Sequence, residues 1–242
     1  MSAWVVIPTY NERENLPELL RQVFVQPIED LHVLIVDDAS PDGTGRLADQ
    51  LADQHPHLHV LHHPGKGGLA RAYVDGFRFA LARGAQFLFE MDADFSHNPS
   101  VLPLLYRSVV GDADLALGSR YCPGGQIRNW NWPRRWVSRL GNWYARRILH
   151  LPIADLTGGF KCYRRATIEC IDLTTITSTG YNFQIELTYK AFLAGCRIVE
   201  LPITFTERRL GRSKFHFGIV WESMRGVWKL RSYSKHTRAA HL

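Results

Sequence analysis

Short apolar runs alternate with helical patterns through the first half of the chain, and this alternation constrains the fold most strongly. The runs predict strands at Ala3–Ile7, His32–Val36, a stretch ending at Val60-Leu61, Gln86–Met91 and Leu115–Gly118. Between them the periodicity predicts helices at Asn15–Phe24, Thr44–Gln54, Gly67–Arg83 and Pro99–Val109. This order is typical of an α/β fold, with a mostly parallel sheet covered by helices on both faces.

The second half has fewer strand signals. It predicts a helix at Pro133–Leu149, another at Asn182–Ala194, and a strand at Ile198–Phe205. Pro202 cannot donate to a sheet ladder, so we expect that strand to be an edge or irregular strand. Asn15 and Glu18 form a candidate capping box for the first helix. We expect one domain over residues 1–214 and a basic amphipathic helix and tail over 215–242, which either packs on the core or lies on a membrane.

Polar segments follow four of the predicted strands. They are Pro8–Glu12, Asp37–Gly43, Asp92–Asp94 and Ser119–Tyr121. Each alone could be a turn, because Asp, Ser, Pro and Gly are also turn formers. Ligands of parallel α/β sheets bind at the carboxyl ends of the strands. Four such segments on one rim therefore predict a binding site at that edge.

The charge of the chain favours an anionic partner. The formal net charge is +6, which suits nucleic acid, a phosphorylated substrate or an anionic membrane surface. No RNP-like or helix-turn-helix signature is present, so we expect no nucleic acid. GxxxxGK[ST] and GxGxxG are absent, although Gly65–Gly68 could present backbone N–H groups to an anion. The eleven histidines show no HExxH or comparable zinc spacing.

Asp92 and Asp94 stand one residue apart at the end of a predicted buried strand. Burying unpaired carboxylates is costly, so a cation is expected beside them. Mg²⁺ and Mn²⁺ prefer oxygen ligands, and Mg²⁺ often takes one or two carboxylates together with substrate phosphates. The pair therefore indicates a site for Mg²⁺ or Mn²⁺ that arrives with a nucleotide diphosphate.

The helix predicted at Pro133–Leu149 is amphipathic. It could dock on the core with solvated arginines, or lie in a membrane interface with aromatics among the headgroups and arginines on lipid phosphates. The density of tryptophans favours the second interpretation. No apolar run approaches the ~18 residues of a spanning helix, so the expected contact is peripheral. The apolar side holds Trp132, Trp136, Val137, Leu140, Trp143, Tyr144 and Ile148, and the other side holds Arg134, Arg135, Arg139 and Arg146.

An ordered set of motifs carries a family resemblance. It comprises VVIPTYNERENLPELL, VDDASPDGT, GKGGLARAY, MDADFSH, GSRY, DLTGGFKCYRR and RRLGRSK. From residue 4 to about 216 the chain resembles the polyprenol-phosphate mannose synthases, which include the dolichol-phosphate mannosyltransferases of glycosyltransferase family 2. The resemblance implies a GT-A fold and a metal-dependent, inverting transfer of mannose from GDP-mannose to a polyprenyl (dolichyl-type) phosphate. It also implies a peripheral position on the cytoplasmic face of a membrane.

The resemblance further implies roles for individual residues. Asp94 and Arg120 would be catalytic, and Asp92 and Asp94 would hold the metal. Ser96 departs from relatives that have Gln there as a further metal ligand. The loop with Arg208 and Lys214 is expected to close over the donor. The implied donor-binding residues are Pro8, Tyr10, Glu12, Val36, Asp38, Asp92, Ala93, Asp94, Arg208 and Lys214, and the implied acceptor-phosphate residues are Arg120, Arg134 and Ser138.

Two other functions stay open. A sister enzyme could use another nucleotide sugar such as UDP-glucose, because donor choice rests on few contacts. A non-catalytic nucleotide-sugar or membrane-binding module is also conceivable, but the intact Asp92/Asp94 pair argues against it. No His–Asp or Ser–His arrangement stands out. An acceptor phosphate is already anionic and needs little help from a base, so catalysis would rest on positioning and electrostatics. The sequence leaves protein partners unassigned.

Overall fold

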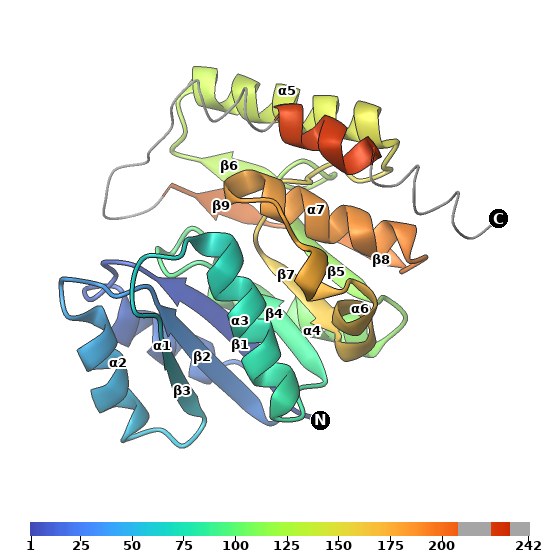
Figure 1. Ribbon diagram of the computed structural model, residues 1–242. Coiled ribbons are helices and arrows are strands. Elements are labelled where there is room, and N and C mark those ends of the chain that lie inside the picture. The colour runs from blue at the N-terminus through green and yellow to red at the C-terminus, as the bar shows by residue number, and fades with distance from the viewer. Residues whose placement is uncertain (208–223, 233–242) are drawn as a thin grey trace.

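The computed structural model describes residues 1–207 and 224–232, and within them a seven-stranded sheet forms the centre of the molecule (Figure 1). The strand order is β3-β2-β1-β4-β7-β5-β8. Neighbouring strands are parallel except for β7, which runs antiparallel to both β4 and β5. The expected mostly parallel α/β sheet is thus confirmed. Its strands are β1 (Ala3–Thr9), β2 (Leu31–Asp37), β3 (Leu58–His62), β4 (Phe87–Glu90), β5 (Leu115–Ser119), β7 (Lys161–Arg164) and β8 (Ile198–Pro202).

Helices cover both faces of this sheet because its strands alternate between two apolar faces. In β1, Val5 and Ile7 face one core cluster, whereas Trp4 and Val6 face the other. The first cluster is covered by α1 (Leu16–Phe24), α2 (Thr44–Ala52) and α4 (Leu102–Val110), which follows the 3₁₀ turn η1 (Pro99–Val101). The second is covered by α3 (Leu69–Ala82), α6 (Arg165–Cys170) and α7 (Gly180–Leu193), with the 3₁₀ turn η2 (Leu173–Thr175) between the last two.

Helix α5 (Trp132–Leu149) lies beyond the sheet, and the helical residues 224–232 lie beside it (Figure 1). Ala145 and Leu149 of α5 pack with Val227 and Leu230 in a third apolar cluster, which also includes residues of α7. The Arg231 guanidinium donates to the Ile148 carbonyl at 2.6 Å. The described part of the C-terminal segment therefore packs on the core.

The face of α5 that docks is not its tryptophan face. Ala145 and Leu149 are buried, whereas the side chains of Trp132, Trp136 and Trp143 are 73%, 60% and 62% exposed. Docking of α5 on the core is therefore confirmed, but the three tryptophans take no part in it, and the membrane interpretation stays a prediction. None of the helices in the described ranges combines the length and the apolar character needed to cross a bilayer.

Two local expectations need correction. Asn15 makes no capping bond from its side chain. Its amide instead donates to the Glu12 carboxylate at 2.7 Å, and Glu18 binds Arg21, so no capping box forms. The single strand expected over Ile198–Phe205 is two strands. The first, β8, ends at Pro202 on the sheet edge, and β9 (Thr204–Thr206) pairs with β6 (Gln126–Arg128) in a separate small sheet.

Helix α3 lies unusually close to the sheet at Gly76, which leads to a testable prediction. A Cβ atom added there would lie 2.5 Å from Val6 Cγ1 and 3.2 Å from Val36 Cγ2. Alanine at a helix interior gains about 0.5–1 kcal/mol over glycine, but overpacking a core costs about 1–3 kcal/mol. We expect Gly76→Ala to lower the free energy of unfolding in urea, while Arg78→Ala on the exposed face changes it little. A stabilised Gly76→Ala variant would contradict this close packing.

Candidate active site

The loops after β1, β2 and β4 meet at the carboxyl edge of the sheet and enclose a cavity of about 340 Å³, here called the β1–β4 cavity. Most of the residues expected to bind the donor lie on its walls. Lys66 adds a cation that the sequence did not assign to the site, with its ammonium 3.7 Å from the centre of the Tyr10 ring. The expected donor residues that line the cavity are Pro8, Tyr10, Glu12, Asp38, Asp92, Ala93 and Asp94.

Three of the loops at this edge hold a non-glycine residue in the left-handed region. Asn11 after β1, Ala39 after β2 and Phe95 after β4 have φ values of 62°, 55° and 61°. A left-handed conformation costs an L-residue about 1–2 kcal/mol. Such strained residues persist where the surrounding structure holds them, and they cluster at ligand sites. Their position supports a functional role for this edge.

Asp38 organises the wall of the β1–β4 cavity. Its Oδ1 atom hydrogen-bonds to His63 Nδ1 at 2.7 Å, and its Oδ2 atom accepts the backbone N–H groups of Gly67 and Gly68 at 3.1 and 2.8 Å. The glycine amides that could have met an external anion therefore bind this carboxylate.

Val36 differs from the other expected donor residues. Its side chain is fully buried in the second core cluster and does not line the cavity, so any donor contact falls to its backbone.

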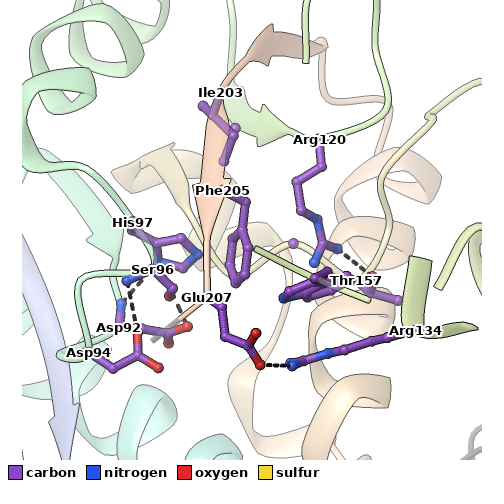
Figure 2. Close-up of a pocket in the computed structure, with 14 residues that line it drawn as sticks. Asp92, Asp94, Ser96, His97, Arg120, Arg134, Thr157, Ile203, Phe205 and Glu207 are labelled. Atoms are coloured by element: carbon purple, nitrogen blue, oxygen red, sulfur yellow. Dashed lines mark hydrogen bonds and ion pairs between the residues drawn. The ribbon is translucent and has the colours of Figure 1, made fainter. Parts of the chain in front are cut away.

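Asp92 and Asp94 line the β1–β4 cavity and also a second cavity, of about 100 Å³, here called the arginine cavity (Figure 2). Asp94 Oδ1 accepts the Ser96 backbone N–H at 3.0 Å. The buried Ser96 hydroxyl has no hydrogen-bond partner among the described residues. Two carboxylates and an unpaired hydroxyl are oxygen ligands, so the residues present fit a Mg²⁺ or Mn²⁺ ion.

His97 is a buried residue that positions the loop carrying Asp92 and Asp94, here called the acidic loop. Its Nδ1 atom accepts the Asp92 backbone N–H at 3.1 Å, and its ring stacks on Phe160 with the ring centres 4.8 Å apart. Burial lowers the pKa of His97 to about 4, so the imidazole stays neutral and keeps the lone pair that the Asp92 amide needs. The sequence motif contained His97, but its spacing did not indicate this role.

Arg120 lies across the arginine cavity from the acidic pair (Figure 2). Its Nε and Nη2 atoms donate to the two Asp155 carboxylate oxygens, each at 2.7 Å, and Nη2 also donates to the Thr157 hydroxyl at 2.7 Å. Burial alone would raise the pKa of Asp155, but the charge and hydrogen bonds of Arg120 bring it below its ordinary value. Arg120 is therefore a fixed cation, held by a carboxylate that the sequence did not assign to the site.

Arg134 reaches the same cavity from the first turn of α5. Its guanidinium donates to the Glu207 carboxylate at 2.7 Å (Figure 2). It also lies 4.2 Å from the centre of the Trp130 ring. Both arginines expected to hold the acceptor phosphate thus line one cavity, each beside a carboxylate. Ser138 is not among the described residues that line either cavity. Arg208 and Lys214, with the loop expected to close over the donor, lie outside the described residues.

Asn142 connects α5 to the loop that carries Asp155. Its Oδ1 atom accepts the backbone N–H groups of Leu156 and Thr157 at 2.7 and 3.3 Å. Its Nδ2 atom donates to the Ser138 carbonyl at 3.0 Å and to the Thr157 hydroxyl at 3.2 Å. Because that hydroxyl also accepts from Arg120, a continuous hydrogen-bond chain runs from α5 to the arginine cavity.

Comparison with known proteins gives a consistent set of relatives. A model described as glycosyl transferase family 2 matches residues 4–172. A polyprenol monophosphomannose synthase from Mycolicibacterium smegmatis is 50% identical over 230 residues, which cover 94% of this chain and 86% of the relative. An undecaprenyl-phosphate mannosyltransferase from Micrococcus luteus is 47% identical over 241 residues, covering 99% of this chain and 98% of the relative.

A solved structure with the same fold comes from Mycobacterium tuberculosis. It is a glucosyl-3-phosphoglycerate synthase in complex with Mn²⁺, uridine diphosphate and glucosyl-3-phosphoglycerate, with a TM-score of 0.65 and 15% sequence identity. The match covers 96% of this chain and 79% of that one. At this identity the likeness bears on the fold alone, and it agrees with the sheet and helix layers described above.

The bonds of Asn142 generate a prediction about stability. Asn142→Ala leaves the buried Leu156 N–H and the half-buried Thr157 N–H without their acceptor, and an unsatisfied buried group costs about 1–3 kcal/mol. We therefore expect a clear drop in melting temperature. Ser138→Ala is the matched control one turn earlier on α5, because the bond to Asn142 uses the Ser138 carbonyl, and we expect its melting temperature to stay near that of the unmodified protein. Equal melting temperatures for the two variants would count against the bridging role of Asn142.

Proposed function

Since this chain belongs to the polyprenol-phosphate mannose synthases of glycosyltransferase family 2 and is a glycosyltransferase, we propose that it transfers mannose from GDP-mannose to a polyprenyl phosphate. The products would be polyprenyl phosphate β-mannose and GDP, with inversion at the sugar. The observation that carries the proposal is that Asp92 and Asp94 line both cavities. They stand between the β1–β4 cavity, which is the larger of the two, and the arginine cavity, whose arginines suit a second anion.

The two substrates would occupy the two cavities. The nucleotide and sugar of the donor lie in the β1–β4 cavity, with the diphosphate toward Asp92 and Asp94. Asp92, Asp94 and the Ser96 hydroxyl would hold Mg²⁺ or Mn²⁺, which supplies positive charge to the diphosphate leaving group when bound. The acceptor phosphate enters the arginine cavity on the opposite side of the sugar. An attack from that side displaces GDP in one step and inverts the anomeric carbon.

The arginine cavity would orient the nucleophile rather than deprotonate it. Arg120 is already fixed by Asp155, so little reorganisation accompanies phosphate binding. Arg134 is bound to Glu207, and an incoming phosphate would compete with that carboxylate for the guanidinium. A phosphate with two negative charges is the stronger partner at close range. The neutral His97 keeps the acidic loop in position without adding charge.

The lipid acceptor implies a membrane surface, and α5 supports a peripheral contact. Trp132, Trp136 and Trp143 point outward from a helix whose first turn carries Arg134 of the arginine cavity. Tryptophan side chains favour the headgroup region of a bilayer. We infer that α5 lies on the cytoplasmic face of a membrane, where it brings the arginine cavity close to the phosphates of lipid acceptors.

A transfer assay tests the proposed function. Radiolabelled GDP-mannose or UDP-glucose is incubated with polyprenyl phosphate in vesicles, with and without EDTA. We expect lipid-linked mannose from GDP-mannose alone, and loss of product in EDTA that added Mg²⁺ or Mn²⁺ restores. Product from UDP-glucose instead would assign the chain to a sister transferase. Nucleotide-sugar binding without any lipid product would indicate a non-catalytic module.

The acidic pair gives a sharper prediction within this assay. Asp94→Asn removes one negative charge from the oxygen ligands while keeping a similar shape. We expect transfer to fall by about two orders of magnitude or more with the fold retained, because a charge that acts on the leaving group is lost. Asp53→Asn, at the exposed end of α2, is the charge-matched control and should transfer normally. Near-normal transfer by Asp94→Asn would exclude the proposed metal site.

The outward tryptophans give an independent prediction about the membrane. We expect replacement of Trp132, Trp136 and Trp143 by serine to reduce binding to vesicles and transfer to a long-chain acceptor. GDP binding and the melting temperature should change little, because these side chains are exposed. Val25→Ser, at an exposed apolar residue after α1, is the control and should bind vesicles normally. A large drop in melting temperature with unchanged vesicle binding would contradict the proposed contact.

A further inference from the structure

A group of histidines lies at the amino-terminal edge of the sheet, at the opposite end of the strands from Asp92 and Asp94. Asp30 precedes β2, His32 is its second residue, and His57 directly precedes β3. One possible ligand atom from each of these three residues lies within 4.8 Å of the other two. The proposed transferase reaction uses none of them. The sequence spacing gave no zinc signal because strand pairing brings the ligands together from two segments.

His32 is the fixed member of the group. Its ring stacks on the buried Trp4 ring with the centres 4.6 Å apart and the planes 8° apart. Its Nδ1 atom lies 3.1 Å from His59 Nε2, and its Nε2 atom lies 3.1 Å from the Asp30 carboxylate. Stacking and two polar contacts therefore orient one nitrogen of His32 toward Asp30.

His59 can set the tautomer of His32. Its ring stacks on Trp4 with the centres 4.7 Å apart. Its Nε2 atom, 3.1 Å from His32 Nδ1, can accept the Nδ1–H of His32, which leaves the lone pair of His32 Nε2 on the side of Asp30. Histidines that bind metals commonly donate their other ring N–H to such an acceptor.

The other two members can adjust their positions. His57 and Asp30 are exposed, and the His57 ring lies over His32 with the centres 4.4 Å apart. Metal–ligand distances of about 2.0–2.1 Å in a tetrahedral site require ligand atoms roughly 3.3 Å apart. Rotation of the two exposed side chains around the fixed His32 can supply that approach. Water can fill the remaining position, because the group lies at the surface.

We propose that Asp30, His32 and His57 form a site for Zn²⁺, with His59 as the residue that orients His32. Two imidazoles and one carboxylate suit Zn²⁺ and Cu²⁺, whereas Mg²⁺ and Mn²⁺ prefer oxygen ligands alone. The ion would join the turn before β2 to the segment before β3. The chain would then hold two metals of different chemistry at opposite ends of its parallel strands, and this proposal does not depend on the transferase function.

The first test measures Zn²⁺ binding by calorimetry with the full-length chain free of any affinity tag. Asp92→Asn and Asp94→Asn are combined in the background to remove the acidic pair as a competing site. We expect one Zn²⁺ per chain, with affinity lowered about tenfold or more by His57→Ala or Asp30→Asn. His55→Ala is the matched control, because His55 is also exposed and stacks on Phe24 instead. We expect it to bind Zn²⁺ as the background protein does.

The second test identifies the ligands with Cu²⁺ as the probe. Electron paramagnetic resonance of the same background protein should show coupling to two imidazole nitrogens, and His57→Ala should show one. His59→Phe keeps all three ligands and should weaken Zn²⁺ binding about 10–100-fold. Circular dichroism checks that each variant is folded. Absence of Zn²⁺ binding, equal losses in His55→Ala and His57→Ala, or coordination by oxygen alone would each overturn the proposal.

Discussion

Arg120 and Asp155 carry opposite charges that folding removes almost entirely from water. Each buried ion costs several kcal/mol in lost hydration, so the pair is tolerated only with close, well-aligned contacts. The loop that carries Asp155 is held from three directions. Arg120 follows β5, Asn142 comes from α5, and the Glu200 carboxylate of β8 accepts the Asp155 backbone N–H at 3.0 Å. This loop therefore holds the sheet, α5 and the arginine cavity in fixed positions relative to one another.

A second cluster of buried polar residues surrounds Glu90, two residues before Asp92. Glu90 of β4 stands opposite Lys161 of β7, and the Tyr163 hydroxyl donates to Glu90 at 2.9 Å. The Lys161 ammonium donates to the Gln184 carbonyl at 3.0 Å. Burial lowers the pKa of Lys161 to about 8 and raises that of Glu90. Glu90, two residues before Asp92, thus stands opposite the cation of Lys161 on β7, and this cation is separate from any metal bound by Asp92 and Asp94.

The sequence predicted the features that depend on the local periodicity of apolar residues and on short motifs. The parallel strands and amphipathic helices of the first half, and most of the β1–β4 cavity, follow from apolar runs and strand-end motifs. β7 was not predicted, because its four residues include Lys161 and Arg164 and its burial depends on distant Glu90 and Gln184. The period of α5 predicted a helix but not its buried face, which the third apolar cluster selects. The roles of Asp155 and Asn142 likewise depend on tertiary contacts, so no spacing of residues in the sequence reveals them.

The position of β7 also sets an order of events during synthesis on the ribosome. β7 lies between β4 and β5 in the sheet but leaves the ribosome after both of them. At about 5–20 residues per second, β4 waits roughly 4–15 seconds for this neighbour. During that interval one edge of β4, which contains Phe87 and Phe89, is open to pairing with other chains. The nascent chain therefore passes through a stage in which this strand edge is exposed, although the finished sheet buries the strand completely.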